Sequence, residues 1–442
     1  MAYVDKKYTV SGNENLIGIA GEAGFGVGIC PGNLLPDGMT PMAGYDIPAS
    51  DNYGNYVYQD GSIVCWIPRF YYKITAGTNT PDIKGIDTYA TQTLANAASY
   101  AMHRSFIDGG TDQQGFFVDK YMCSKNAWGS GYIASSLKDG LPISTASTHN
   151  PIADLTACGT NAHFEVIDAA HARDGVDGAV NGSSTWCCTS KFMRGALALL
   201  SLAHGQAVSN TAFCEWYDAT YNHPKGCNNN ALKDYDEVTN GAGTGDDLLY
   251  VTDGYSNCGK TGSGVPFAKS THNGQNCGIA DVNGLMYEID IGMTCDGTDF
   301  YGAKESIAMK SFTSGNSAAT DHWGATGIAA MMDTLTVSFV TGNDGWIYFG
   351  NAANQVLAED VSGNSWVLAG LGLPETIDGL SAAGTNQFGK DGLYRYIVNE
   401  LCVLSCGYWL YPSNAGVWSV HLYVYRASSN YAAGFRLGLY PE

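Results

Sequence analysis

The chain has 442 residues, more than one ordinary hydrophobic core accommodates, so two or three domains are expected. Its formal net charge is −20, and no cluster of Lys or Arg is present that would neutralise a run of phosphates, so nucleic acid is not expected as a partner. No stretch approaches 18 uninterrupted apolar residues, and the first residues lack the apolar core of a secretory signal. We therefore expect a protein that is made in a cytosol and does not insert into a membrane.

The first quarter of the chain is predicted to be rich in β-strands. Residues 1–75 alternate short β-like runs with Gly, Asn and Pro, which predicts a small β domain that anchors the chain. A polar, turn-rich stretch follows, and residues 76–114 are interpreted as a linker.

The remainder, residues 115–442, is predicted to be one large α+β domain. Helical periodicity is present over residues 161–173 and 189–204, and both segments are long enough to cover a β core. Asn, Gly, Asp and Ser dominate residues 220–280, but interspersed aromatic and aliphatic residues favour long ordered loops over disorder. Strand-like runs then return at residues 285–291, 334–340, 346–349 and 418–425.

The thirteen cysteines contain no Cys-x-x-Cys pair, the spacing that zinc sites usually need. We expect most of them to be buried, reduced thiols. The histidines form no metal-binding motif, and we interpret His149, His163, His171, His204 and His223 as ordinary surface or core residues. Asp-rich turns lack the spacing of a strong calcium loop. No metal and no cofactor are therefore expected.

The segment from residue 418 to residue 425 alternates between two kinds of side chain. Trp418, Val420, Leu422 and Val424 share one face, which we expect to belong to the core. The opposite face is predicted to be a display surface, and it carries Ser419, His421, Tyr423 and Tyr425.

Neighbouring residues extend this surface with the chemistry that recognition loops favour, rigid amphipathic rings beside adaptable hydrogen-bonding groups. They are Tyr408, Leu410, Tyr411, Asn430 and Tyr431. A simpler alternative is a solvated strand face, because Tyr has a high β propensity in any case. Trp409, Trp418, Phe435 and Arg436 are expected to be structural, with Arg436 anchoring the chain end on carbonyls or a carboxylate.

Residues 278–289 resemble the G-x-x-D-x-x-G-N-V-W-E-W motif of the formylglycine-generating branch of the C-type-lectin fold. Asp281, Gly284, Tyr287 and Glu288 fall on matching positions. The C-terminal stretch also resembles the end of that fold, with a Gly-Tyr-Trp from Gly407 and a final Gly-Phe-Arg from Gly434. The resemblance covers residues 115–442 and implies a C-type-lectin-like domain with long loop insertions.

Within that fold the spacing is most similar to the variable proteins of diversity-generating retroelements, including the major tropism determinants of phages. The resemblance implies a phage tail-fibre tip, located in the virion and assembled in the host cytoplasm. Its implied partners are a host cell-surface protein or glycan at the C-terminal face and other tail or baseplate proteins at the N-terminal domain. A homotrimer and no catalytic activity are also implied.

Two other classes of function stay open. A formylglycine-generating oxidoreductase needs a copper-binding cysteine pair near the C-terminus. Here Cys402 and Cys406 precede the variable-like segment, and residues 425–430 contain no cysteine where that branch has its ligands. A purely structural virion protein is the second alternative.

Overall fold

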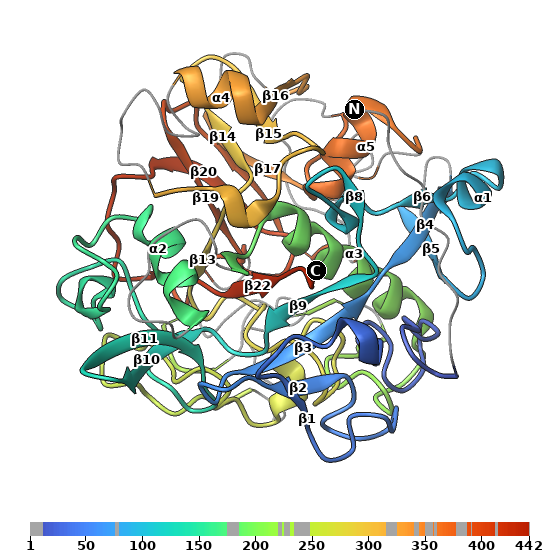
Figure 1. Cartoon of the computed structure of the whole chain (residues 1–442), viewed down its shortest axis with the longest axis horizontal. Coiled ribbons are helices and arrows are strands. Elements are labelled where there is room, and N and C mark those ends of the chain that lie inside the picture. Colours follow the sequence, from blue (N-terminus) through green and yellow to red (C-terminus); the bar gives the residue numbers. More distant parts are fainter. Residues whose placement is uncertain are drawn as a thin grey trace.

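The computed structural model describes residues 12–75, 79–174, 185–219, 223–224, 230–233, 248–314, 325–339, 344–349, 357, 360–376, 387–389, 391–411 and 414–441. Over these residues the chain has the predicted α+β character, with many strands and few helices (Figure 1). No helix in the described part is long and apolar enough to span a membrane.

The first of two six-stranded sheets joins the two ends of the chain. All of its pairings are antiparallel. In spatial order its strands are β1 (Thr40–Pro41), β2 (Asn55–Val57), β3 (Ile63–Pro68), β9 (Gly115–Asp119), β22 (Leu437–Leu439) and β12 (Trp186–Cys188). The prediction of a separate β domain over residues 1–75 therefore needs correction. Strand β3 is apolar and almost wholly buried, and it pairs with β9 from beyond the expected boundary.

The segment interpreted as a linker, residues 76–114, is folded wherever it is described. Strand β5 (Thr80–Gly85) pairs with β4 (Phe70–Thr75), which also pairs with β6 (Ala101–Met102). Met102, Phe106 and Ile107 are buried, and this apolar surface is what holds the segment against the core. The remaining elements here are α1 (Gln92–Ala97), β7 (Ile107–Asp108) and β8 (Thr111–Asp112).

The second six-stranded sheet is built from the C-terminal third and one earlier strand. In spatial order it contains β17 (Gly345–Tyr348), β18 (Gly392–Arg395), β20 (Val420–Tyr425), β19 (Leu401–Ser405), β13 (Tyr287–Asp290) and β21 (Ala433–Gly434). Pairing is antiparallel except between β18 and β20 and between β13 and β21. Smaller sheets are formed by β10 (Cys123–Trp128) with β11 (Gly131–Ser136), and by β14 (Met293–Cys295), β15 (Phe300–Ala303) and β16 (Met332–Leu335).

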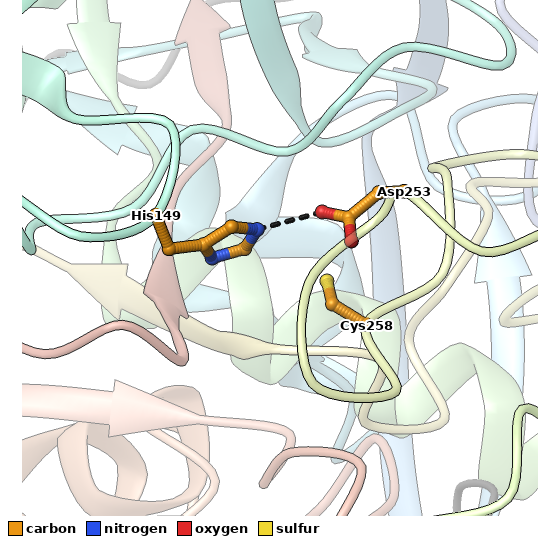
Figure 2. Close-up of side chains that lie close together, drawn as sticks. All are labelled: His149, Asp253 and Cys258. Atoms are coloured by element: carbon orange, nitrogen blue, oxygen red, sulfur yellow. Dashed lines mark hydrogen bonds and ion pairs between the residues drawn. The ribbon is translucent and has the colours of Figure 1, made fainter.

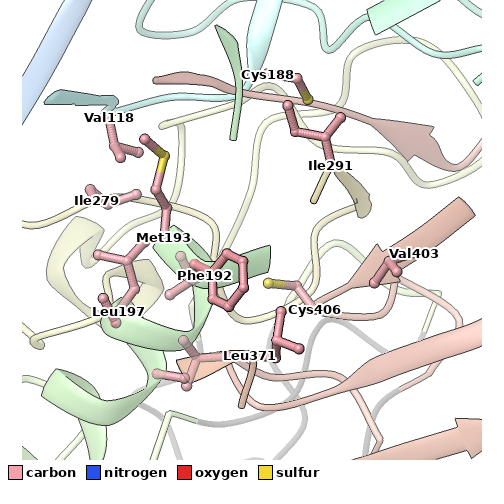
Figure 3. Close-up of a cluster of buried hydrophobic side chains, with 14 of the residues drawn as sticks. Val118, Cys188, Phe192, Met193, Leu197, Ile279, Ile291, Leu371, Val403 and Cys406 are labelled. Atoms are coloured by element: carbon pink, nitrogen blue, oxygen red, sulfur yellow. The ribbon is translucent and has the colours of Figure 1, made fainter. Parts of the chain in front are cut away.

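Helix α3 (Lys191–Ala207) lies near the centre of the molecule (Figure 1). Ser190 caps its N-terminus by accepting a hydrogen bond from the backbone N–H of Met193. Figure 3 shows Phe192 and Met193 among side chains of both large sheets, including Val118 of β9 and Val403 of β19. The helix therefore fills the space between the two sheets.

The two helices expected from periodicity are confirmed as α2 (Glu165–His171) and α3. Three short helices were not expected, and they are α1, α4 (Ala325–Met331) and α5 (Gly363–Gly370). Helix α5 approaches α3 closely, because a Cβ at Gly195 would lie 2.1 Å from the carbonyl oxygen of Gly370.

A buried ionic network ties these layers together. The carboxylate of Glu288 on β13 accepts hydrogen bonds from Arg194 Nη2 and from Arg436 Nε, each at 2.6 Å. Arg436 also donates to the backbone carbonyls of Lys120 and Ala280, so the predicted anchoring role of Arg436 is confirmed. Burial by itself raises the pKa of Glu288, but the charges and hydrogen bonds of the two arginines hold that pKa below its ordinary value.

We predict that Glu288→Gln lowers the free energy of unfolding by about 3–5 kcal/mol, because it leaves two buried guanidinium groups without their carboxylate. Denaturant unfolding measures the change. Asp154→Asn is the matched control, since it removes the partly exposed Lys125–Asp154 ion pair and should cost no more than about 1 kcal/mol. Equal losses in the two variants would contradict a central role for the network.

Candidate functional site

A row of aromatic side chains crosses three neighbouring strands of the second sheet. Trp346 on β17 lies opposite Tyr394 on β18, and Tyr394 lies opposite His421 on β20. Residues directly opposite each other on paired strands point to the same face, which brings their side chains into contact. The ring centroids of Trp346 lie 5.4 Å from Tyr394 and 4.9 Å from His421.

Rings from other segments cover this row. Tyr287 of β13 lies 4.7 Å from His421, and Tyr411, in the loop after β19, stacks on His421 at 5.7 Å. Tyr408 lies 4.8 Å from Tyr287, and the hydroxyl oxygens of Tyr287 and Tyr423 are 3.4 Å apart. We call these seven residues the aromatic cluster: Tyr287, Trp346, Tyr394, Tyr408, Tyr411, His421 and Tyr423.

An exposed rim adjoins the aromatic cluster. Its members are Tyr396, Leu410, Tyr425 and Tyr431, all with large accessible side chains. Tyr425 is the last residue of β20 and is 52% exposed. The register between β20 and β19 shifts between His421 and Val424, so Tyr425 lies opposite Leu401 and does not continue the alternation of His421 and Tyr423. Tyr431 reaches the cluster through Trp409, which contacts the rings of both Tyr431 and Tyr408.

Two of the expected contact residues are buried and need correction. Ser419 is fully buried, and its hydroxyl lies within hydrogen-bonding distance of two acceptors, the backbone oxygen of Asn414 and the carboxylate of Asp391. His421 is 1% exposed beneath the aromatic rings, and burial lowers its pKa to about 3. The first half of strand β20 is buried, because the rings of Tyr287, Trp346 and Tyr411 cover the face that carries His421. Direct contact with a partner is therefore left to other members of the predicted set.

The other predicted contact residues are accessible to different degrees. Leu410, Tyr425 and Tyr431 are exposed, whereas the half-buried members are Tyr408, Tyr411, Tyr423 and Asn430. Asn430 is also committed to structure, because its side-chain oxygen accepts from the backbone N–H of Ala432 and its backbone exchanges hydrogen bonds with Thr145.

Sequence reasoning missed four aromatic residues of this region, which are Trp346, Tyr348, Tyr394 and Tyr396. A signal was present, because each pair is spaced by two residues, as are His421 and Tyr423. That spacing places both rings of a pair on one face of a strand. The structure places Trp346 opposite Tyr394 and Tyr394 opposite His421, and nothing local in the sequence indicates that alignment.

The residues expected to be structural are confirmed as buried, and they are Trp409, Trp418, Phe435 and Arg436. Trp418 packs edge-on against the rings of Phe349 and Phe388.

The cysteines agree with the expectation of buried thiols. Every described cysteine is buried, and none of them is joined in a disulfide. Cys227 lies outside the described residues. Cys406 is directed into the apolar cluster that contains Phe192 and Leu371 (Figure 3). Burial raises the pKa of Cys406 to about 12 and raises that of Cys402 as well, so both thiols keep their protons.

One group of side chains in the described part could share a metal ion, and it includes neither Cys402 nor Cys406. It consists of His149, Asp253 and Cys258 (Figure 2). The interpretation of His149 as an ordinary histidine overlooked this group, because His149 lies more than 100 residues before Asp253 and Cys258 in the sequence.

We predict that His421 stays neutral down to about pH 4, because its pKa is lowered to about 3. An unfolded histidine takes up its proton near pH 6.5, so the stability that this site contributes is complete above pH 6.5 and is lost as the pH falls towards 3. NMR titration of the imidazole ring measures the pKa. A midpoint near 6.5 would show that water reaches the ring.

The sequence matches no protein-family model and no curated protein. The functional assignment therefore depends on the geometry of the aromatic cluster and its exposed rim.

Proposed function

We propose that the chain is a receptor-binding protein of the phage tail-fibre-tip class, whose C-type-lectin-like domain binds a host cell-surface protein or glycan. The observation that carries the proposal is the gathering of aromatic rings from five separate segments beneath a rim of exposed tyrosines and a leucine. Large exposed apolar side chains grouped on one face indicate a binding surface. Tyrosine suits recognition, because its ring gives rigid contact area and its hydroxyl gives a hydrogen bond.

Contacts between the motif segments support a C-type-lectin-like fold. Glu288 of the first motif pairs with Arg436 of the final Gly-Phe-Arg. Gly284 has a φ of +94°, and a Cβ there would lie 2.5 Å from both Ala415 and the carbonyl oxygen of Cys406. Both contacts bring together segments that resemble that fold and lie more than 100 residues apart in the sequence.

The net charge narrows the class of receptor. A chain with a formal charge of −20 repels a polyanionic surface at long range, and the attraction of a few tyrosine hydroxyls does not offset this. We therefore favour a protein or a neutral glycan, held by ring stacking and by hydrogen bonds from the rim. Burial and protonation of Cys402 and Cys406 support binding over the oxidoreductase alternative.

The binding prediction concerns the exposed rim. Replacing Tyr425 and Tyr431 together by Ser should weaken binding at least about thirtyfold, because truncating a central interface aromatic costs about 2 kcal/mol or more. The free energy of unfolding should change by only about 0.5 kcal/mol per substitution, since both side chains are exposed. Adsorption of fluorescent protein to a panel of bacterial strains measures binding.

Tyr132→Ser is the matched control, because Tyr132 is 47% exposed but lies on the β10–β11 hairpin. Trp418→Ala gives the opposite contrast, since truncation of this buried ring should cost about 3–5 kcal/mol of stability and lose binding only through unfolding. Normal adsorption of the double rim variant would move the site to the loops of residues 220–280. Of these, residues 220–222, 225–229 and 234–247 lie outside the described residues.

A second prediction concerns assembly. We expect a homotrimer, because the resemblance is to trimeric fibre tips and three copies of a weak site add as avidity. Light scattering on the purified protein should give three times the mass of the chain. A strictly monomeric mass at micromolar concentration would contradict the fibre-tip assignment.

A further inference from the structure

Three chemically different side chains converge beside the C-terminal segment. His149 Nε2 lies 2.6 Å from Asp253 Oδ2, and one ligand atom from each of His149, Asp253 and Cys258 lies within 4.8 Å of the other two. The side chains of His149 and Asp253 are 4% and 1% exposed, and Cys258 is fully buried. Figure 2 shows the imidazole of His149 facing the loop that carries the other two residues.

The hydrogen bonds of His149 fix which ring nitrogen is available. Nδ1 lies 2.8 Å from the backbone carbonyl oxygen of Tyr431, and a carbonyl oxygen only accepts, so Nδ1 carries the hydrogen. In a neutral ring Nε2 then presents a lone pair, and it faces a carboxylate oxygen. Two electron pairs in such close contact require a cation between them, either a proton or a metal ion.

The loop that carries Asp253 and Cys258 is held in a fixed shape. The backbone N–H of Asp253 donates to the carbonyl of Cys258 at 2.9 Å, and the strands on either side pair through Thr252 and Gly259. The N–H of Tyr255 donates to Asp253 Oδ1 at 2.8 Å, which directs Oδ2 towards His149. The ring of Tyr255 also stacks on His149 at 4.1 Å. In metal sites, hydrogen bonds to the ligand atoms that do not bind the ion, such as Nδ1 of His149 and Oδ1 of Asp253 here, orient the ligands.

We propose that His149 Nε2, Asp253 Oδ2 and Cys258 Sγ together bind one Zn²⁺ ion. A nitrogen, a hard oxygen and a thiolate form a ligand set that suits zinc. Zinc takes nitrogen and oxygen at about 2.0–2.2 Å and sulfur at about 2.3 Å, so the ligand atoms of a tetrahedral site lie about 3.3–3.6 Å apart. His149 Nε2 and Asp253 Oδ2, now 2.6 Å apart, must therefore separate to admit the ion, while any pair near the 4.8 Å limit must close by about 1 Å. Water completes the coordination.

Zinc binding balances without any other reactant. Burial, and then the charge of Asp253, raise the pKa of the Cys258 thiol well above its ordinary value, so this thiol is protonated in the absence of an ion. The charge of a bound zinc ion lowers that pKa, the thiol releases its proton to solvent and becomes the thiolate ligand, and any proton on His149 Nε2 is released in the same way. A nucleophilic cysteine is a second hypothesis for the same three residues, and it needs a hydrogen bond from the thiol to a histidine nitrogen. The hydrogen bond described for Cys258 Sγ goes to the backbone carbonyl of Gly259, whereas the two nitrogens of His149 face Asp253 and Tyr431, so the structure does not join the thiol to the histidine.

The zinc ion would join His149, which contacts the backbone of Tyr431, to the loop from Asp253 to Cys258. His149 holds the backbone of Tyr431, and the loop from Asp253 to Cys258 carries Tyr255, whose ring lies 5.7 Å from that of Tyr431. The inference does not depend on receptor binding, because it concerns only the ligand atoms and their supports.

The test is metal analysis of the full chain, purified without chelator and supplied with Zn²⁺ alone. We expect one zinc per chain, and its loss in both His149→Gln and Cys258→Ser. Matched controls are His163→Gln and Cys30→Ser, which replace a buried histidine and a buried thiol outside the group and should keep the zinc. Zinc should also raise the melting temperature of the wild type and leave that of Cys258→Ser unchanged.

A second measurement on the unaltered chain covers the case in which a variant fails to fold. Co²⁺ in place of zinc should give a thiolate-to-cobalt charge-transfer band in the near ultraviolet. Absence of both that band and stoichiometric zinc would overturn the proposal and leave a His149–Asp253 ion pair beside a buried thiol. Zinc retained in both site variants would also overturn it, because other cysteines would then hold the ion.

Discussion

The structure depends on the carboxylate of Glu288, which is shared by Arg194 of helix α3 and Arg436 near the chain end. Removing such charges from water costs several kcal/mol per ion, and this cost is offset only when each group is paired and hydrogen-bonded. Arg436 stands between β21 of the second sheet and β22 of the first sheet. A single short segment therefore joins both large sheets, and the ion pair fixes where the chain crosses from one to the other.

The pairing of Glu288 with the two arginines also positions the aromatic cluster. Tyr287 and Glu288 are consecutive on β13, and consecutive residues of a strand point to opposite faces. Glu288 therefore turns into the ionic network while Tyr287 turns towards His421. Arg194 and Arg436 hold Glu288 in place, and this fixes the neighbouring Tyr287 where its ring contacts Tyr408 and Tyr411. The proposed binding surface is therefore supported by a rigid, charged interior.

Some of the fold could be read from local pattern. Helix α3 has a capping Ser190 and a long apolar run, and both signals are local. The division into an anchoring domain, a linker and a second domain could not be read in this way. Strand β3 pairs with β9, and β9 pairs with β22, which lies more than 300 residues further along the chain. Pairing between strands so far apart in the sequence is decided by which apolar strands come together when the chain collapses into its hydrophobic core.

For the candidate site, the sequence by itself determined the chemistry of the C-terminal segment, the tyrosine-rich face, the structural tryptophans and the anchoring role of Arg436. Only the tertiary structure decided which of those side chains water reaches. His421 and Tyr423 contact each other on one face of β20, yet His421 is buried and Tyr423 is half-buried. A register shift against β19 then breaks the alternation before the exposed Tyr425. The physical reason is that alternation fixes only the direction of a side chain, whereas burial depends on what covers that face. Here Trp346, Tyr287 and Tyr411 cover His421, and they come from three distant segments.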